Sequence, residues 1–373
     1  MYVSSIRLKI YESTRRLLNR DVNVLSVPLH YVTLAQLRKS FRNIVKYSFS
    51  LLVYLLLLFI AVVKSIKASG AKLILASNAP DLTGVICALV NILTFGKVQY
   101  IYELRELTPE LYTVRASMSS TLYKLLLFLE KIATSRSSYI ITVSNAMKSL
   151  LLKRYYRDPV RIVTIYPALN TDIVDLKDIL KEKRNIKRRH DKIVAVYGGS
   201  YQEQIHDFET LFKAISMLKG YSIKIKIIGK GEPKYRQKLL DIVKRCNLKE
   251  IVEFRPLMPK EEYLKILSQA DIAFIPLKRN MLTMIAVPNK FTEYCALDKH
   301  IIAPKLLGII EVKREYNKIY IYEPENPLSL KNAILKCIKD IENNTSYPTR
   351  LNVTYTWRYE RIKFLNIINK FLN

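Results

Sequence analysis

The feature that most constrains this fold is a repeated order of segments: a short apolar run, a loop, then a longer segment with helical periodicity. The order recurs through both halves of the 373-residue chain, which is long enough for two domains. The strand-sized apolar runs include 71–77, 98–102, 139–143, 192–197, 221–228 and 271–275. Because parallel strands need crossover connections, usually helices, the alternation predicts α/β domains with doubly wound parallel sheets.

Composition limits the classes of partner. Lys and Arg number 61 against 32 Asp and Glu, so the net charge is +29 and favours an anionic partner: nucleic acid, a membrane surface or a phosphorylated substrate. The basic runs lack the interleaved aromatic side chains that stack on bases, so we expect no specific nucleic-acid partner. The four cysteines form no CxxC pair, which indicates reduced core residues in a cytoplasmic protein rather than a zinc site or a disulfide framework.

The first 70 residues combine basic and apolar segments. Residues 1–20 have an amphipathic helical pattern, Val22–Val27 resembles a strand, and Tyr47–Val63 contains 13 uninterrupted apolar residues, Leu51–Val63. A membrane-spanning helix needs about 20 such residues, so a buried or membrane-dipping crossover helix is favoured over a transmembrane one. The basic face beside this helix is either a solvated surface or a site for anionic lipid headgroups.

Glycine is scarce and clustered. The chain has nine glycines, where average usage would give roughly 26, and five of the nine fall between residues 198 and 231. Gly198, Gly199 and Ser200 follow a strand and precede a helix, and Gly229-Lys230-Gly231 ends the next strand. Backbone N–H groups in such turns can face a diphosphate, although each could also be a plain tight turn.

The stretch VPNKFTEYCALDKHIIA, residues 287–303, predicts a loop, a short helix and a buried strand. Pro288 suits the start of the helix, and Lys290 and Glu293 then share one helical face near strand ends. A cation and an acid placed there can hold a phosphate and a sugar hydroxyl, or they form an ordinary surface ion pair. Together with the two glycine turns, the pair predicts a nucleotide or phosphate site at the carboxyl ends of the strands.

A second charged segment follows a strand of the first half. Glu103 and Glu106 could act as a base or orient a hydroxyl, and Arg105 could hold an anionic acceptor. The alternative is a charged surface loop. His206 precedes a helix and could contact a phosphate or be a loop residue, and the remaining histidines show no metal-ligand spacing.

The order of these motifs resembles glycosyltransferase family 4, which has the GT-B fold of two Rossmann-like domains facing across a cleft. The second half carries the resemblance in GGS, IKIIGKGEP and VPNKFTEYCALDKHIIA, and the first half in YIYELRELTPE and IVTIYPALN. The resemblance implies four segments. They are an acceptor-side domain over 1–168, a charged linker over 169–191, a nucleotide-sugar domain over 192–345 and a helix over 346–373 that crosses back to the first domain.

The resemblance also implies a function. It predicts a retaining, hexosyltransferase-like enzyme that moves a sugar from a nucleotide-diphosphate sugar to a glycan or polyprenyl-linked acceptor, with no metal or other cofactor. The PxK spacing before Glu293 is similar to that of enzymes that act on lipid-linked sugars. We therefore expect a peripheral protein on the inner face of the cell membrane, with an anionic membrane surface as a partner.

The resemblance assigns donor contacts along the second half. Glu293 would bind the donor ribose, Lys290 and the preceding backbone would lie near the phosphates, and the backbone at Leu257 would flank the base. The expected donor-binding residues are Gly198, Gly199, Ser200, His206, Lys230, Leu257, Pro288, Asn289, Lys290 and Glu293. The expected catalytic residues are Glu103, Arg105 and Glu106.

Three departures from the family pattern favour an alternative. The first of the family's paired glutamates falls on Ile285, and the usual Arg and Lys after the first glycine turn are replaced at best by His206. Met1 opens on the first helix, so we expect a late start that omits a strand and its glycine loop. These differences suggest a weak or inactive relative that binds nucleotide sugars or a protein partner.

Overall fold

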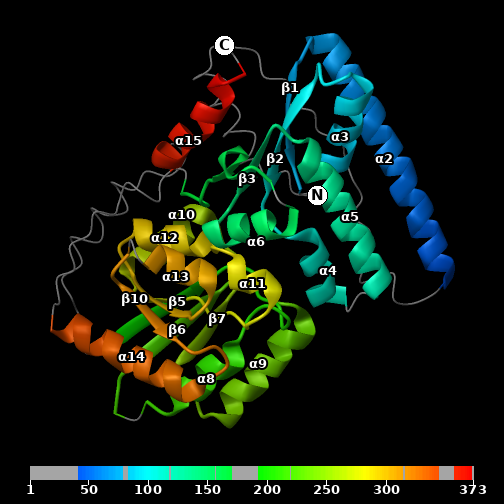
Figure 1. The fold of residues 1–373 in the computed structure, drawn as a ribbon. Helices are drawn as coiled ribbons and strands as arrows, with labels where there is room; N and C mark the ends of the chain where they lie inside the picture. The colour runs from blue at the N-terminus through cyan, green and yellow to red at the C-terminus, as the bar shows by residue number, and fades with distance from the viewer. Residues whose placement is uncertain are drawn as a thin grey trace. The chain divides into compact units, whose positions relative to one another are not determined.

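The structure is a computed structural model, and it describes most of the chain from Phe41 onward. The described residues are 41–78, 83–116, 119–155, 157–169, 192–218, 220–313, 316–343 and 357–371. The expected helix over 1–20, the strand Val22–Val27 and nearly all of the charged linker lie outside them. Contacts group the chain into two units: unit 1, Met1–Ile141 with Arg154–Ile162, and unit 2, Thr142–Lys153 with Val163–Asn373. Figure 1 shows the elements of each.

A four-stranded sheet of order β1-β2-β3-β4 underlies the first part of the chain. β1 and β2 run parallel, with Leu73 opposite Gln99 and Ser77 opposite Glu103. The elements here are α2 (Phe41–Ser69), β1 (Leu73–Ser77), α3 (Thr83–Leu93), β2 (Gln99–Leu104), α4 (Thr108–Ala116), α5 (Ser120–Arg136), β3 (Tyr139–Thr142), α6 (Asn145–Tyr155) and β4 (Ile162–Thr164). The sequence-based alternation of strands and helices is therefore confirmed for these residues.

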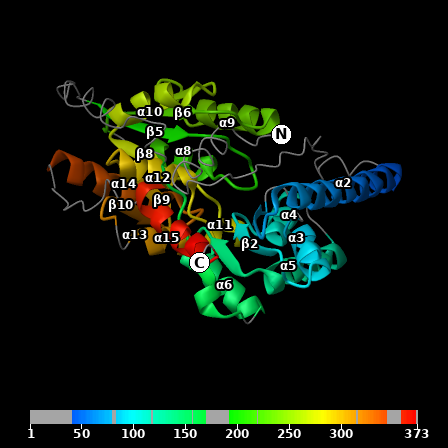
Figure 2. The same ribbon diagram turned by 90° about the horizontal axis from the view of Figure 1, so that it is seen from above.

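Helix α2 is the apolar segment predicted before the first described strand. Its Leu58 side chain is buried, but Leu56 and Leu57 are more than half exposed. Two views show α2 beside α3, and α3 contacts α5 in turn (Figures 1 and 2). Among the described helices, none is long and apolar enough to cross a membrane.

Unit 2 holds a six-stranded sheet of order β10-β9-β8-β5-β6-β7. Its strands are β5 (Ile193–Gly198), β6 (Ile223–Ile228), β7 (Val252–Arg255), β8 (Ile272–Phe274), β9 (His300–Pro304) and β10 (Ile319–Tyr322). All neighbouring strands of this sheet run parallel, and its first strand in the sequence, β5, lies between β6 and β8. This is the doubly wound arrangement, in which the direction of strand addition reverses beside β5 and ligands bind at the carboxyl ends of the strands at that point.

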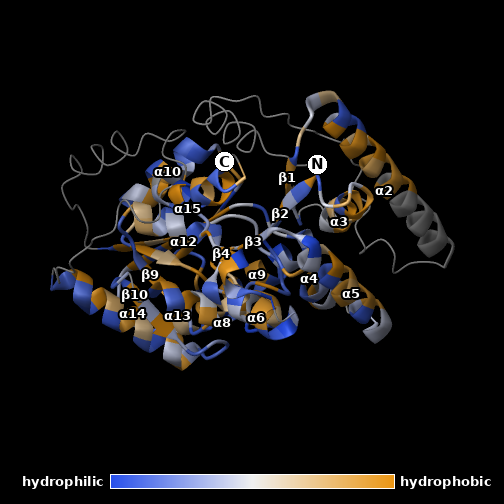
Figure 3. Cartoon of the chain, turned by 45° about the horizontal axis from the view of Figure 1, so that its top comes forward, coloured by the Kyte–Doolittle hydropathy of each residue, from blue (hydrophilic) through white to orange (hydrophobic). Residues whose placement is uncertain are grey.

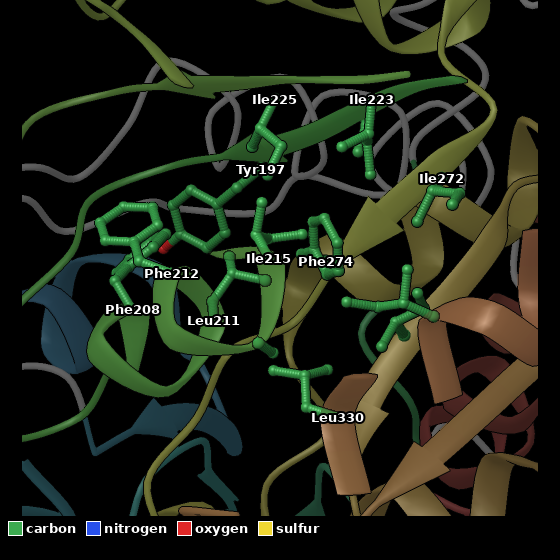
Figure 4. Close-up of a cluster of buried hydrophobic side chains, with 14 of the residues drawn as sticks. Tyr197, Phe208, Leu211, Phe212, Ile215, Ile223, Ile225, Ile272, Phe274 and Leu330 are labelled. Atoms are coloured by element: carbon green, nitrogen blue, oxygen red, sulfur yellow. The ribbon is translucent and has the colours of Figure 1, made fainter. Parts of the chain in front are cut away.

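Most of α6 and all the helices after β5 belong to unit 2. The latter are α8 (Phe208–Ser216), α9 (Pro233–Arg245), α10 (Lys260–Gln269), α11 (Met281–Ile285), α12 (Asn289–Ala296), α13 (Leu307–Lys313), α14 (Pro327–Glu342) and α15 (Trp357–Asn369). In α8, Phe208, Leu211, Phe212 and Ile215 are spaced for one helical face, and all four are buried (Figure 4). Burying each such side chain stabilises the fold by about 1.5–3 kcal/mol.

Local caps fix where these helices begin. The Asp207 side chain accepts a hydrogen bond of 3.1 Å from Thr210 N and so caps α8. Ser144 caps α6 through a 2.9 Å bond from Met147 N. The four cysteines are free, and three of them are buried in the cores as expected.

Three helices are absent from the sequence-based assignment. Helix α4 lies where a charged segment suggested a loop, and α11 and α13 have only five and seven residues. Helix α11 is specified by a capping box, in which Thr283 N donates to Asn280 Oδ1 at 2.9 Å and Asn280 N donates to Thr283 Oγ1 at 3.1 Å. Short helices carry too little periodicity to be recognised, although the Asn280–Thr283 spacing was a usable signal.

Candidate functional site

The glycine turn after β5 lies at the switch point of the sheet, where successive strands begin to be added on the other side of β5. Gly199 has φ of +122°, a conformation that glycine tolerates and other residues rarely adopt. Its N–H donates to Ile228 O at 2.8 Å, and Gly229 N, at the end of β6, donates to Arg255 O at 3.0 Å. These bonds align the carboxyl ends of β5, β6 and β7, so the two predicted glycine turns lie at one edge of the sheet.

Neighbouring atoms lie too close to these glycines to admit a side chain. A Cβ on Gly229 would lie 2.1 Å from Gly199 O, and a Cβ on Gly198 would overlap the Tyr263 ring. The Gly198 N–H donates to Tyr294 Oη at 3.2 Å, so α12 is tied directly to the end of β5. Glycines at these positions therefore allow the ends of β5 and β6 to approach each other and α10 to pack against β5.

Lys290 lies in the first turn of α12 and reaches over the glycine turn. Its Nζ is 4.9 Å from the centre of the Tyr197 ring, and a Cβ on Gly199 would meet Lys290 Cε at 2.8 Å. Burial lowers the pKa of Lys290 to about 8, with Glu293 opposing and Lys260 adding to the shift. The ammonium group of this half-buried lysine thus lies against the Gly199 backbone, and its positive charge there favours an anionic ligand.

Glu293 lies one helical turn after Lys290 and is mostly buried, with 15% of its side chain exposed. Its Oε1 accepts a hydrogen bond from Lys260 Nζ of α10. Lys260 in turn lies 5.2 Å above the Tyr263 ring. An ionised carboxylate offers about four acceptor positions, so this ion pair leaves room for hydroxyl donors on the same group.

His206 packs between Tyr197 and Phe208 and is 7% exposed. His206 Nδ1 lies 3.0 Å from Gln202 N and 3.3 Å from Gln202 O, so the Gln202 backbone holds this side of the ring. Burial and then the nearby Lys290 lower the pKa of His206 to about 3. The ring is therefore neutral at physiological pH and brings no positive charge to a phosphate.

The other predicted donor residues lie around the same edge. Lys230 and Leu257 are exposed and follow β6 and β7, and Ser200 O accepts from Tyr197 Oη at 2.7 Å. Pro288 occupies the N-cap position of α12, and Asn289 is the first residue of that helix. Ile285 is 5% exposed at the end of α11, so an apolar side chain occupies the position where the family pattern would have an acid.

The three catalytic candidates belong to unit 1, at the end of β2. Glu103 lies within the strand, and its Oε1 accepts from Arg105 Nε at 2.9 Å in a solvent-facing ion pair. Arg105 and Glu106 follow the strand and are exposed. Buried Asn78 holds this turn: its Oδ1 accepts from Arg105 N at 2.9 Å and its amide donates to Glu106 O.

Four residues that organise these sites escaped the sequence-based prediction. They are Tyr197 beneath Lys290, Tyr294 bonded to Gly198 N, Lys260 paired with Glu293, and Asn78 at the turn after β2. Only Asn78 gave a usable signal, because an Asn directly after an apolar strand often bonds to neighbouring backbone. In the described part of the chain, no three His, Cys, Asp or Glu side chains are grouped so that they could hold a metal ion.

Comparison with known proteins identifies the domain that carries the glycine turns and Lys290. Residues 192–340 match the family described as glycosyl transferases group 1. The chain therefore contains a glycosyl transferases group 1 domain. A curated relative, an uncharacterized glycosyltransferase of Methanocaldococcus jannaschii, is 24% identical over 220 residues. That match covers 57% of this chain and 54% of the relative, about half its length.

Solved structures agree on the fold. Sucrose-phosphate synthase from Thermosynechococcus elongatus gives a TM-score of 0.64 at 16% identity, over 84% of this chain and 77% of that one. Anabaena HepE in complex with UDP gives 0.62 at 15% identity, over 84% and 81%. The chain therefore has the GT-B fold of two parallel-sheet α/β domains, and both the predicted fold class and the resemblance to these glycosyltransferases are confirmed.

Proposed function

We propose that this protein is a glycosyltransferase that moves a sugar from a nucleotide-diphosphate sugar to a glycan or lipid-linked acceptor at a membrane surface, with retention of anomeric configuration. The observation that carries the proposal is the position of Lys290. A partly buried ammonium group faces the backbone of a glycine turn with positive φ, at the switch point of a parallel sheet. That combination suits a diphosphate better than a neutral ligand.

The chemistry follows from where charge develops. When the anomeric carbon separates from its leaving oxygen, negative charge accumulates on the departing diphosphate. Lys290 and the N–H groups at the start of α12 would stabilise that charge, and they do so best where water is excluded. Glu293 would accept hydrogen bonds from the donor ribose through the part of its carboxylate that Lys260 leaves open.

The nucleotide most worth testing first is uridine diphosphate. HepE of the same fold is described in complexes with UDP and with UDP-glucose, at 15–16% identity. For the acceptor side, Glu103, Arg105 and Glu106 are proposed as the residues that activate a hydroxyl and hold an anionic acceptor. The exposure of Arg105 and Glu106 after β2 supports this role, because an acceptor must reach them from solvent.

The first experiment measures UDP binding by calorimetry. Glu293→Ala and Lys290→Ala should each weaken binding about tenfold to hundredfold, since each removes a charge-assisted contact of about 1.5–3 kcal/mol. Matched controls are Glu342→Ala and Lys336→Ala, which remove exposed charges from α14 of the same unit. Unchanged binding in both site variants would reject the proposed donor site.

The second experiment tests transfer. Purified protein is incubated with labelled UDP-sugars and membrane lipid extract, and the anomeric configuration of any product is determined by NMR. Retention is the expected outcome. Tight UDP binding without transfer or hydrolysis of any donor would favour the alternative, a nucleotide-sugar-binding relative, for which the apolar Ile285 is the supporting observation.

A further inference from the structure

Three neighbouring helices of unit 1 present large apolar side chains to solvent. On α2 the exposed residues Val53, Leu56, Leu57 and Ile60 follow helical spacing and form one stripe. Helix α3 and the turn after it add Leu89, Ile92, Leu93 and Phe95, and α5 adds Leu122, Leu125 and Phe128. We call these eleven residues the apolar face. Phe95 is 93% exposed, an extreme value for an aromatic side chain.

The three helices adjoin one another, so their apolar residues belong to one region of unit 1. Helix α3 contacts both α2 and α5. Colouring by hydropathy shows hydrophobic segments along all three (Figure 3). Soluble proteins rarely leave so many large apolar side chains exposed in one region, so this region marks a site of interaction.

The charge around the apolar face identifies its partner. Lys64 and Lys67 continue the α2 stripe, Lys97 follows Phe95, and Lys124 lies beside Leu125; all four are exposed. Helices α2 and α3 contain no acidic residue, and the only one in α5, Glu130, is buried against Arg154. An apolar area surrounded by cations without exposed carboxylates matches a bilayer with anionic headgroups.

A second copy of this chain is a poorer match. Two such surfaces brought together would oppose lysines to lysines without carboxylates to neutralise them, which costs association free energy. An anionic bilayer removes that repulsion and also receives the leucines and phenylalanines. We propose that the apolar face, with Lys64, Lys67, Lys97 and Lys124, is a docking surface for an anionic phospholipid bilayer, bound from one side. This inference deepens the proposed function, resting on it for the membrane acceptor.

The test uses the full-length protein and sedimentation with phospholipid vesicles. Vesicles contain either phosphatidylcholine alone or an equal mixture with phosphatidylglycerol. The variant Leu57→Gln/Leu93→Gln/Phe128→Gln removes one exposed apolar residue from each helix. Its partition constant for mixed vesicles should be at least about tenfold below that of the wild type. The matched control, Met217→Gln/Leu307→Gln/Leu328→Gln, removes three exposed apolar residues from unit 2 and should bind vesicles like the wild type.

A charge variant tests the lipid headgroup. Lys64→Gln/Lys67→Gln/Lys97→Gln should lose about tenfold to hundredfold in affinity for mixed vesicles and almost none for phosphatidylcholine. Its control removes three exposed lysines of unit 2, Lys249, Lys336 and Lys339. Both sets are checked for folding by circular dichroism and thermal unfolding, which do not depend on any ligand. If a triple variant does not fold, Leu57→Gln and Phe128→Gln are measured singly.

Clear outcomes would overturn the inference. Equal vesicle binding by wild type and apolar-face variants would mean that another occupant covers the face, such as the 40 residues that precede α2. A wild-type dimer that the apolar-face variant converts to monomer would assign the face to a second copy. Vesicle binding needs neither donor nor acceptor, so its failure alone leaves sugar transfer standing, and failure of transfer alone leaves the docking surface standing.

Discussion

At the scale of single residues, the surroundings of Lys290 change its pKa from that of an ordinary lysine. Its ammonium group lies over Tyr197 and against Gly199, and burial lowers its pKa to about 8. A lysine with that pKa changes charge within the range where proteins can be assayed. Its protonation therefore makes two measurable properties depend on pH. Ligand affinity should fall as pH rises, whereas the contribution of this group to folding stability should rise.

Affinity for UDP should fall as pH rises through about 8, because only protonated Lys290 attracts the diphosphate. Above that pH, the loss should approach tenfold per pH unit until the ligand-bound pKa is reached. Calorimetric titrations at a series of pH values from neutral upward measure it. Lys290→Arg is the control: its side chain stays charged, so its affinity should be flat over this range. A wild-type profile as flat as that of the arginine variant would contradict the role.

Stability should respond in the other direction. Between about pH 8 and the ordinary lysine value of 10.5, the unfolded chain binds a proton at this position that the folded chain has released. Folding stability from this group therefore rises with pH through that window. Urea unfolding at several pH values, compared with Lys290→Met, isolates the contribution. A difference between the two proteins that does not change with pH would exclude a shifted Lys290.

Substitution of Gly199 can separate the cost of an unfavourable φ from the loss of ligand binding at a blocked site. Gly199→Ala places a methyl group 2.8 Å from Lys290 Cε at φ of +122°, so both stability and UDP affinity should fall. Gly220→Ala also forces a positive φ, +85°, but its Cβ would meet open space. We expect each to cost about 1–3 kcal/mol of stability, while only Gly199→Ala weakens UDP binding about tenfold or more. Equal UDP affinity in the two variants would remove the turn from the donor site.

At the scale of elements, the short helix α13 helps to fix the start of α6. Both carboxylate oxygens of Glu311 accept hydrogen bonds from the first turn of α6, from Asn145 N at 2.8 Å and Ala146 N at 2.9 Å. The end of α11 joins them, since Ser144 Oγ donates to Ile285 O at 2.5 Å. Three segments distant in sequence thus meet at one helix N-terminus within unit 2.

Glu311→Ala should lower the free energy of unfolding by about 1–2 kcal/mol, because two N–H groups lose a charged acceptor at a helix N-terminus. Urea unfolding followed by circular dichroism measures it. Glu325→Ala, at an exposed acid that precedes the N-cap of α14, should change stability by no more than about 0.5 kcal/mol. If Glu311→Ala is as stable as that control, the contact does not support α6.

The elements also show what the sequence could predict. Strand-helix alternation placed β1, β2, β3, β5, β6 and β8 because each strand is a short apolar run whose partners need not be known. The Lys290–Glu293 spacing likewise follows from helical geometry alone. Glu311 could not be connected with α6, because 165 residues separate it from Ala146 and no local pattern records such a contact. The lowered pKa of Lys290 was equally inaccessible, since it depends on burial by the fold.

At the scale of the whole molecule, contacts divide the chain into two units, and each has its own internal support. In unit 1, Arg154 joins buried Glu110 at 2.7 Å and Glu130 at 3.3 Å, and Tyr155 Oη donates to Glu130 at 2.6 Å. In unit 2, the proposed UDP site lies at the sheet switch point. A substitution or ligand confined to one unit should therefore change mainly the unfolding free energy of that unit.

Two perturbations should move different parts of thermal unfolding. Arg154→Met leaves two buried carboxylates without their cation, so unit 1 should lose about 3–5 kcal/mol. UDP binds folded unit 2 in the proposal, so a hundredfold excess over its dissociation constant should stabilise that unit by about 2.7 kcal/mol. Calorimetry of Arg154→Met with UDP should then show one transition lowered and a second raised. Arg161→Ala removes only a 3.9 Å solvent-exposed pair in unit 1 and should leave both transitions near wild type. A single transition that shifts as a whole with either perturbation would mean that the two units unfold together.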